Sequence, residues 1–289
     1  MTMIKKLLCA LALMITCSAA SAAGGGYTLD KAPDRVNDLA SLQNGAKLFV
    51  NYCLNCHSAS AMRYNKLKDI GLTDQQIKES LLFTGEKVGD LMLGSLTVKD
   101  GKAWFGVPPP DLSVMARAKA QSASVTGADY IYTYLRTFYR DTSKPTGWNN
   151  LAFPDAGMPH VLWERQGPRA MTEITLHQHE AAGSKGGHGN ATWERVTTTY
   201  DAAGYATSKT EEVKGYNGKA KTEYQFKPAD AARSAAYDND MADLTAFMTW
   251  MSEPIQQTRK QIGVWVMLFL GLFLVVAWRL NAPYWKHVK

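Results

Sequence analysis

The chain has 289 residues, of which 46% are hydrophobic and 20% are charged. This composition excludes a disordered or collagen-like chain, and the length suits one sizeable domain or two small ones. The net charge of +6 is modest and the basic residues are scattered, so we expect no binding to nucleic acid.

The first residues have the pattern of an export signal. Two lysines precede an apolar run over residues 7–15, and three small residues, 20–22, follow it. A basic start, a short apolar stretch and a small-residue cleavage site are typical of a secretory signal peptide. We therefore expect residues 1–22 to be removed and the body of the chain to lie in the periplasm.

The cysteines become informative once the signal peptide is set aside. Cys53 and Cys56 are then the only pair, spaced C-x-x-C and followed at once by His57. A redox disulfide would need a βαβ setting, which the sequence lacks, and would leave His57 without a role. In a c-type haem site the two thiols bond to the porphyrin vinyl groups and the adjacent imidazole reaches the iron. The motif predicts one covalent haem c on Cys53 and Cys56, with His57 as an axial ligand.

The body between the two ends of the chain is predicted to be mainly α-helical. Apolar residues recur at helical spacing in several segments, and no alternation typical of parallel strands appears. The expected helices cover Asp38 to Cys56, Leu112 to about Lys119 after the cap Asp111, Gly127 to Arg140, and Tyr237 to Ser252. Loops rich in glycine and proline join them, which suits a small helical body whose loops enclose a flat cofactor.

Residues 172–228 do not fit that body. They are polar and offer few aliphatic side chains to bury, so we expect a surface insertion with a hairpin or two. Three histidines in this region, His177, His179 and His188, are candidates for a metal site. The glycine-rich spacing between them gives no fixed ligand geometry, so a solvated loop is the preferred interpretation.

The second iron ligand must come from well downstream of His57. Met158 lies in the loop 153–159, which two prolines make rigid and which needs no methionine for packing, so it is the predicted ligand. His160 is the rival and would give a low-potential bis-histidine haem. Met62 is too near His57. The other candidates lie at helical positions and are expected in the core: Met115, Met241, Met248 and Met251.

The C-terminal region has the pattern of a membrane anchor. Residues 262–278 contain no charge, and basic residues flank the run on both sides. A helix of about 20 apolar residues crosses the ~30 Å hydrocarbon layer, and the cationic flanks argue against the alternative of a buried core helix. We expect a transmembrane helix over 259–281 in the inner membrane, a cytoplasmic tail over 282–289, and the body, 23–258, in the periplasm.

Several further motifs accompany the haem run and the C-terminal anchor. They are Asn44 to Phe49 before the run Cys53 to Ser58, then Met62 to Tyr64, Pro109 to Ser113, Ala116 to Ala118, Asp129 to Tyr132, Met158-Pro159, Trp250 and Glu253-Pro254. Together these segments resemble the cytochrome c1 family in its bacterial form. The resemblance covers nearly the whole mature chain, and the proline-rich run and the anchor after Glu-Pro are its most specific marks.

The resemblance implies a cytochrome c-like haem domain in which the haem propionates meet the Tyr130 hydroxyl and a basic side chain after Asp111. The family usually has Arg-Ala-Arg at that place, whereas this chain has Arg117, Ala118 and Lys119. A lysine neutralises a propionate as a point charge, without the bidentate fork of arginine. Which of Arg117 and Lys119 makes the contact stays open.

The same resemblance implies a haem subunit of the ubiquinol–cytochrome c oxidoreductase (bc1) complex. Such a subunit is no enzyme on its own, because it only carries electrons. Its partners would be cytochrome b, the Rieske iron–sulfur protein as electron donor, cytochrome c as acceptor, and membrane lipid, in a dimeric complex.

Other interpretations stay open. The chain would also suit a free membrane-anchored cytochrome shuttle, an oxidase haem subunit, or a haem enzyme with an open coordination site. We expect the helix over 237–252 to run almost straight into the span, which would fix the height of the haem above the bilayer. A fixed height favours a subunit of a complex over a tethered shuttle.

Overall fold

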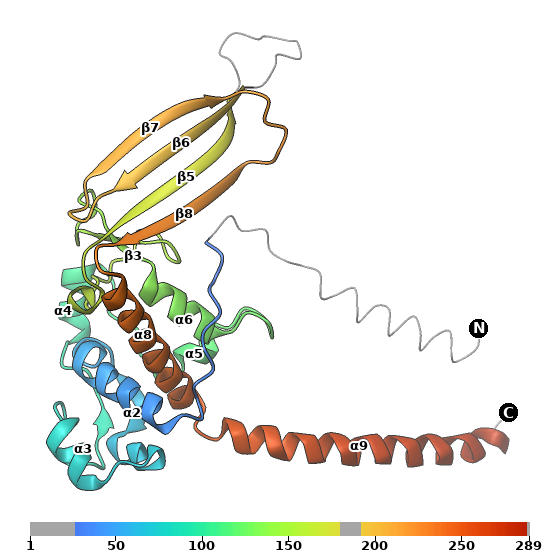
Figure 1. Cartoon of the computed structure of the whole chain (residues 1–289). Coiled ribbons are helices and arrows are strands. Elements are labelled where there is room, and N and C mark those ends of the chain that lie inside the picture. Colours follow the sequence, from blue (N-terminus) through green and yellow to red (C-terminus); the bar gives the residue numbers. More distant parts are fainter. Residues whose placement is uncertain (1–26, 180–191, 288–289) are drawn as a thin grey trace.

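A computed structural model describes residues 27–179 and 192–287. The predicted signal peptide lies outside the described residues. A helical body stands between a four-stranded sheet and a long C-terminal helix (Figure 1). The mainly helical class is therefore confirmed. The sheet is the largest feature whose architecture the sequence analysis did not predict in full.

Helix α2 (Leu39–Leu48) leads directly into the haem motif. The Asp38 carboxylate caps it by accepting hydrogen bonds from two backbone N–H groups of the first turn. The helix then widens into a π-helical turn over Phe49–Cys53. The predicted helix is confirmed, although its regular α-helical part ends at Leu48 and its π-helical turn ends at Cys53 rather than at Cys56.

Helix α8 (Ala231–Ser252) crosses α2 at very short range. A Cβ added to Gly45 of α2 would collide with the carbonyl oxygen of Asp243 and would stand 2.6 Å from Cβ of Phe247. Close by, the rings of Phe49 and Phe247 meet with 5.6 Å between their centroids. The glycine inside α2 is thus a packing requirement, because no side chain fits between the two helices.

Replacing Gly45 with alanine is expected to destabilise the body, because the methyl group has to push α2 and α8 apart. Overpacking of this kind costs ~1–3 kcal/mol, which outweighs the ~1 kcal/mol that alanine gains in helix propensity. Denaturant unfolding of the detergent-solubilised chain, followed by circular dichroism, measures the change. Gly89→Ala is the matched control, since a Cβ there meets no atom within 4 Å. Equal stability of the two variants would contradict the close contact.

Two further predicted helices form with shifted ends. α8 begins at Ala231, after its cap Asp230, rather than at Tyr237. α6 (Gly127–Arg136) ends before Arg140, because the chain continues there as a strand. That strand, β3 (Phe138–Arg140), pairs antiparallel with β4 (Trp148–Asn150). The main core between these helices contains, as predicted, Met241, Met248 and Met251.

The segment after Asp111 differs from the prediction. The helix expected from Leu112 to about Lys119 is only the short α5 (Met115–Ala118), and Asp111 is not its cap. Instead, the Asp111 carboxylate accepts hydrogen bonds from the backbone N–H groups of Ser60 and Ser113, both at 2.8 Å. The prolines before Asp111 keep the backbone extended, so its carboxylate ties this segment to the chain just after the haem motif.

Several short elements lie between the haem motif and α6 or follow the β3–β4 hairpin. They are β1 (Ala59–Arg63), a 3-10 helix (Tyr64–Ile70), α3 (Asp74–Ser80), β2 (Leu91–Met92), α4 (Val98–Phe105) and α7 (Trp163–Gln166). Strands β1 and β2 pair antiparallel. The sequence did not predict these elements, because each is too short for an apolar period to stand out.

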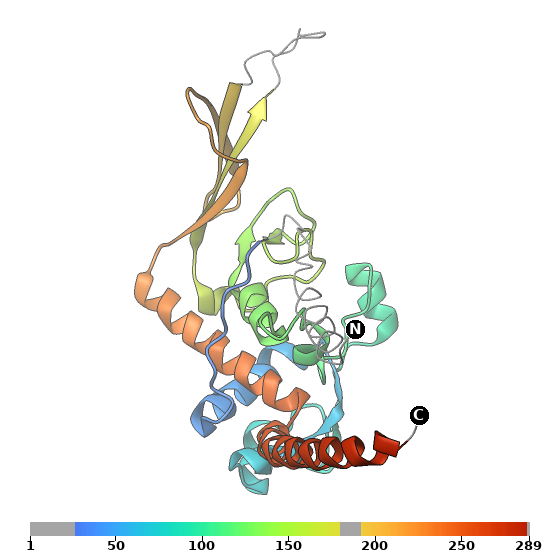
Figure 2. The same cartoon turned by 90° about the vertical axis from the view of Figure 1, so that its right-hand side faces the viewer.

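The polar region expected as a surface insertion forms one antiparallel sheet. Its strands are β5 (Arg169–His179), β6 (Thr192–Tyr200), β7 (Ala206–Val213) and β8 (Lys221–Pro228), in the order β7-β6-β5-β8. The predicted hairpins are confirmed, but they join into a single sheet that projects from the body and is seen almost edge-on in Figure 2. A small second core of Met171, Tyr139 and Leu151 anchors its base.

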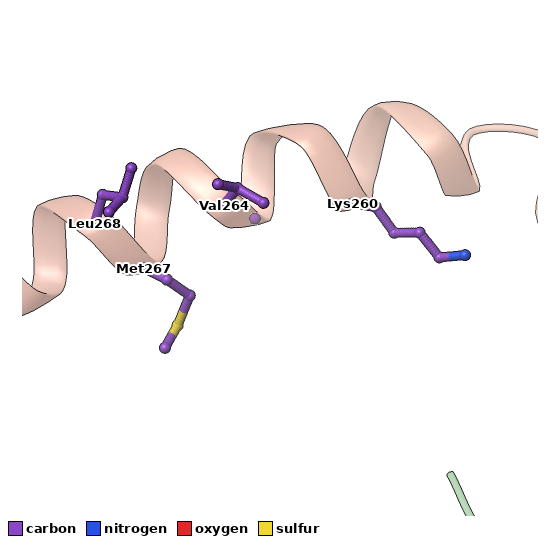
Figure 3. Close-up of a pocket in the computed structure, with 5 residues that line it drawn as sticks. Lys260, Val264, Met267 and Leu268 are labelled. Carbon is purple, nitrogen blue, oxygen red and sulfur yellow. The ribbon is translucent and has the colours of Figure 1, made fainter. Parts of the chain in front are cut away.

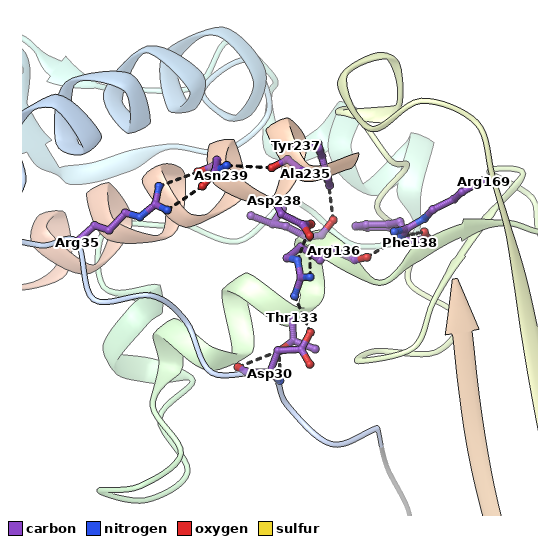
Figure 4. Close-up of polar contacts among 11 residues, drawn as sticks. Asp30, Arg35, Thr133, Arg136, Phe138, Arg169, Ala235, Tyr237, Asp238 and Asn239 are labelled. Carbon is purple, nitrogen blue, oxygen red and sulfur yellow. Dashed lines mark hydrogen bonds and ion pairs between the residues drawn. The ribbon is translucent and has the colours of Figure 1, made fainter. Parts of the chain in front are cut away.

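A half-buried arginine joins the N-terminal segment, α6 and α8 (Figure 4). Arg136 donates two hydrogen bonds to the Asp238 carboxylate, at 2.7 and 2.9 Å, and one to Asp30 at 2.7 Å. This bidentate geometry is the stronger form of an arginine–carboxylate pair. Beside it, the Tyr237 hydroxyl donates to the carbonyl oxygen of Leu135 at 2.7 Å. These contacts fix α6 against α8, and with it the aromatic side chains that α6 presents.

The C-terminal helix α9 (Gln256–Tyr284) matches the predicted anchor. Residues 256–281 are long and apolar enough to cross a membrane, and their most hydrophobic stretch is not buried against the body. The expected straight continuation from α8 is wrong, because α9 leaves the end of α8 at a large angle (Figure 1). Glu253 leaves the helical conformation, with φ −158° and ψ 78°, because the proline that follows disfavours a helical residue before it and has no N–H with which to continue the helix.

Candidate haem site

The haem motif forms one tight helical turn. The backbone N–H groups of Cys56 and His57 both donate to the carbonyl oxygen of Cys53, at 3.1 and 2.9 Å. Cys53 is buried, Cys56 is half-buried, and no disulfide joins the two thiols. Both sulfurs and the imidazole therefore come from a single turn, which is the arrangement that porphyrin attachment at two vinyl groups requires.

The imidazole of His57 is held in one tautomer. Its Nδ1 lies 2.7 Å from the carbonyl oxygen of Pro110, and because a carbonyl only accepts, Nδ1 carries the proton. None of the described residues hydrogen-bonds Nε2, so its lone pair is free for a metal. Burial lowers the pKa of His57 more than the Pro110 carbonyl and the Asp111 charge raise it, which keeps the ring neutral. These features fit an iron ligand of a haem.

Contacts from residues 94–96 hold the haem turn from outside. The backbone N–H of Gly94 donates to Oγ of Ser58 at 2.9 Å, and a Cβ at Gly94 would stand 3.0 Å from the carbonyl oxygen of Leu54. The N–H of Leu96 donates to the carbonyl oxygen of Asn55 at 3.1 Å. Sequence reasoning missed these residues, because a lone glycine gives no sign of which segment approaches it.

The loop that carries Met158 is fixed by two buried asparagines. Oδ1 of Asn150 accepts two backbone N–H groups of the loop, at 2.9 and 3.0 Å. Oδ1 of Asn149 accepts the N–H of Asp155 at 2.9 Å, and Asp155 itself has a left-handed φ of 60°. The shape of this loop therefore depends on the Asn149-Asn150 pair as well as on its prolines, and sequence reasoning missed the two asparagines.

The thioether of Met158 lies beside the aromatic face of α6. The hydroxyl of Tyr134 donates to Sδ across 3.6 Å, and its ring stacks on Tyr130 with 6.0 Å between centroids. Met158 is half-buried. A long O–H···S contact of this kind orients the sulfur without blocking it, since a thioether accepts only weakly.

The rival ligand His160 has different surroundings. It is buried, its ring stacks on Phe138 at 4.7 Å between centroids, and Trp148 meets its edge at 4.9 Å. Phe138 also contacts Tyr134, so the imidazole of His160 packs against a ring that itself meets the tyrosine beside Met158. Burial lowers the pKa of His160 to about 3, which keeps it neutral within this aromatic cluster.

One segment contacts both the His57 region and the Met158 loop. The carbonyl oxygen of Phe105, at the end of α4, would stand 3.1 Å from a Cβ on Gly157, the residue before Met158. At the other end of the same segment, Pro110 accepts the hydrogen bond from His57. Residues 105–110 therefore bring the two regions into one neighbourhood, as a single haem between them requires.

The structure separates the two basic residues that the sequence left as alternatives. Nζ of Lys119 lies 4.9 Å from the ring centroid of Tyr130. Arg117 instead lines a cavity at the foot of α8, together with Thr249 and Glu253. Burial raises the pKa of Tyr130, which keeps its hydroxyl protonated as a donor. Lys119 is thus the basic side chain that accompanies Tyr130.

Two of the three candidate histidines, His177 and His179, lie on a strand rather than in a loop. His177 belongs to β5, and its Nε2 lies 3.9 Å from a carboxylate oxygen of Glu194 on β6. His179 ends the same strand, and His188 lies outside the described residues. Across residues 27–179 and 192–287, no group of histidine, cysteine and carboxylate side chains gathers as a metal site.

The haem turn and the C-terminal helix together define the class of protein. The turn from Cys53 to His57 suits a haem c, and α9 suits attachment of that haem domain to a bilayer, so the chain is a membrane-anchored c-type cytochrome. The sequence profile of the Cytochrome C1 family matches residues 31–91 and 222–288.

Similar proteins agree over the whole chain. Cytochrome c1 of Allochromatium vinosum is 36% identical over 98% of this chain and 99% of its own length. A protein of Nitrosomonas europaea named ammonia monooxygenase gamma subunit is 38% identical over the whole of both chains. Cytochrome c1 of Rhodospirillum rubrum is 23% identical over 100% of this chain and 99% of its own. The chain belongs to the cytochrome c1 family, whose members are the haem electron-transfer subunits of bc1 complexes.

Proposed function

We propose that the chain holds a single haem c, bonded to Cys53 and Cys56, with His57 and Met158 on the two faces of the iron. The observation that carries this proposal is the His57 imidazole, whose Nδ1–H is engaged by Pro110 while Nε2 is free. When bound, the haem supplies a reversible one-electron couple. The chain attaches it, orients its ligands and limits the access of water.

The aromatic face of α6 is the proposed wall of the haem pocket. The Tyr134 hydroxyl contacts the Met158 thioether, and in this proposal Tyr130 and Lys119, which lie side by side, meet the propionates. The ammonium group of Lys119 would neutralise a propionate as a point charge. A thioether ligand favours the ferrous state, so this pocket gives the haem a higher potential than a bis-histidine site would.

The proposed reaction is outer-sphere electron transfer. The chain takes one electron from the Rieske iron–sulfur protein and passes it to a cytochrome c, within a dimeric complex that also contains cytochrome b. It makes and breaks no bond of a substrate, so it is no enzyme by itself. The change of direction between α8 and α9 is compatible with this role. Only the short link Glu253–Ile255 joins the two helices, so the haem domain would stay close to the membrane.

The proposed orientation places the haem domain in the periplasm. Covalent haem attachment takes place outside the cytoplasm, which agrees with the predicted export signal over residues 1–22. Basic residues stand at both ends of α9, with three after the apolar run and two before it. Their distribution supports a cytoplasmic C-terminus only weakly, so the orientation depends chiefly on the haem motif.

Isolation of the chain from its own membranes in a mild detergent tests the proposed complex. We expect an affinity-tagged chain to bring down a b-type haem protein and an iron–sulfur protein, and its pyridine haemochrome spectrum to give one haem c per chain. A monodisperse single-haem protein would overturn the complex in favour of a tethered shuttle. Co-isolation with ammonia-oxidising subunits instead would favour the role named for the Nitrosomonas relative.

A further inference from the structure

A cavity of about 600 Å³ lies at the foot of the helical body, where α8 meets the first turns of α9. The N-terminal segment and the start of α6 complete its walls. Its lining is part apolar, with side chains such as Val36 and Ala246, and part basic, with Lys31, Arg117, Arg259 and Lys260. This cavity is separate from the haem turn, which contributes none of the lining residues.

Two of the basic residues are already neutralised within the cavity. Lys31 pairs with Asp129 at 2.7 Å, and Arg259 pairs with the carboxylate of Glu253. The cavity also contains Asp34, whose carboxylate forms no ion pair among the described residues. The acidic side chains therefore offset only part of the basic charge.

The other two basic residues have no carboxylate partner in the described part of the chain. Arg117 makes no ion pair there, and Nζ of Lys260 donates only to Oε1 of Gln256 at 3.1 Å. Thr245, on the wall formed by α8, is 1% exposed, and its hydroxyl oxygen has no hydrogen-bond partner. A buried hydroxyl without a partner costs about 1–3 kcal/mol, so an oxygen-rich group in this cavity would satisfy it.

Lys260 also begins a shallow apolar groove on the surface of α9. The groove is lined by Lys260, Gly263, Val264, Met267 and Leu268, the first turns of the membrane-spanning helix (Figure 3). Its apolar part starts where the uncharged run starts, so it lies at the depth of acyl chains while the cavity lies at the depth of headgroups. Lys260 therefore lines both a polar cavity and an apolar groove, the combination that the headgroup and an acyl chain of one phospholipid would need.

We propose that the chain binds one anionic phospholipid on the haem-domain side of the membrane. Its phosphate lies in the cavity against Lys260 and Arg117, and one acyl chain follows the groove over Gly263 and Met267. Anionic lipid is favoured over zwitterionic lipid because the cavity lining has four basic and three acidic side chains and therefore a net positive charge. The bound lipid would fill the corner where the chain turns from α8 into α9.

Binding of phosphatidylglycerol to the purified full-length chain in detergent, counted by native mass spectrometry, tests this site. Lys260→Gln is expected to weaken binding about five-fold, the effect of about one surface cation on anionic lipid. Lys99→Gln is the matched control and should bind as the unmodified chain does, because Lys99 is exposed on α4 and lines neither the cavity nor the groove. Equal binding by the two variants, or equal binding of phosphatidylcholine and phosphatidylglycerol by the unmodified chain, would overturn the proposal.

A second variant tests the groove without touching any charge. A Cβ at Gly263 meets no atom within 4 Å, so Gly263→Leu leaves the fold intact and fills the groove. Displacing roughly two methylene groups of lipid should weaken binding about ten-fold. Gly271→Leu is the control, because Gly271 is equally open and lies outside the groove. An unchanged haem spectrum verifies that each variant is folded, and a loss of binding as large in Gly271→Leu as in Gly263→Leu would contradict the groove.

Discussion

A chain in which Cys53 and Cys56 are both replaced with serine is expected to carry no covalent haem. A hydroxyl does not replace the thiol in the bond to a porphyrin vinyl group, and the described residues offer no other cysteine. After denaturing electrophoresis, haem staining of the double variant should fall to background while an immunoblot still detects the chain. The loss is complete rather than graded, because both points of attachment are removed.

Two further variants make this result specific. Cys56→Ser alone keeps the buried thiol of Cys53 and should retain haem through one bond, with weaker staining. Met158→Leu should stain as the unmodified chain does, since Met158 would contact the iron without any covalent bond to the porphyrin. Staining retained by the double variant would show that the haem is held elsewhere, and the assignment of the turn would then be wrong.

The residues that the sequence identified most securely are those in a contiguous motif. Cys53, Cys56 and His57 stand in one run, and their chemistry is clear before any fold is known. The contacts that hold His57 in place are different in kind. One is made by the backbone carbonyl of Pro110, and another is the close approach of the Gly94 backbone, which is possible because glycine has no side chain. A carbonyl is common to every residue, so no pattern of residue types distinguishes this one.

The sheet shows a second limit of sequence reasoning. Hydrophobic alternation predicts a strand only where one face of the sheet is buried. Among residues 169–178 of β5, Met171 and Leu176 alone are buried, and β7 is exposed along nearly its whole length. These strands depend on their backbone ladders and on threonine pairs such as Thr172 with Thr199, which leave no apolar pattern. Composition therefore identified the region as separate, but not its architecture.

The sequence could not decide whether Lys119 or Arg117 lies beside Tyr130, and the reason is different again. The two residues lie on the short turn that ends α5, and their spacing would suit either one for a propionate. The side chains diverge because α5 lies between α6 and α8, so one residue faces Tyr130 and the other faces Glu253. The direction of each side chain therefore depends on how α5 packs against α6 and against α8, which is more than 100 residues away in the sequence.

Replacing Met158 with leucine is expected to leave the haem attached but to lower its potential by on the order of 100 mV. Leucine fills a similar volume, so the loop held by Asn149 and Asn150 should keep its shape. It offers no electron pair to the iron, so the ferrous state loses the thioether that favours it. Because ~59 mV corresponds to a factor of ten for one electron, this shift changes the electron-sharing equilibrium about 50-fold.

A redox titration of the purified chain, followed by its optical spectrum, measures that shift, and carbon monoxide binding to the reduced haem reports the opened position. Met248→Leu is the matched control, because Met248 is 4% exposed in the main core and should change neither quantity. His160→Phe tests the rival ligand and should also leave the potential unchanged, since the imidazole of His160 packs within the aromatic cluster of Phe138 and Trp148. If His160→Phe opens the iron to carbon monoxide and Met158→Leu does not, then the aromatic cluster, rather than the methionine loop, supplies the second ligand.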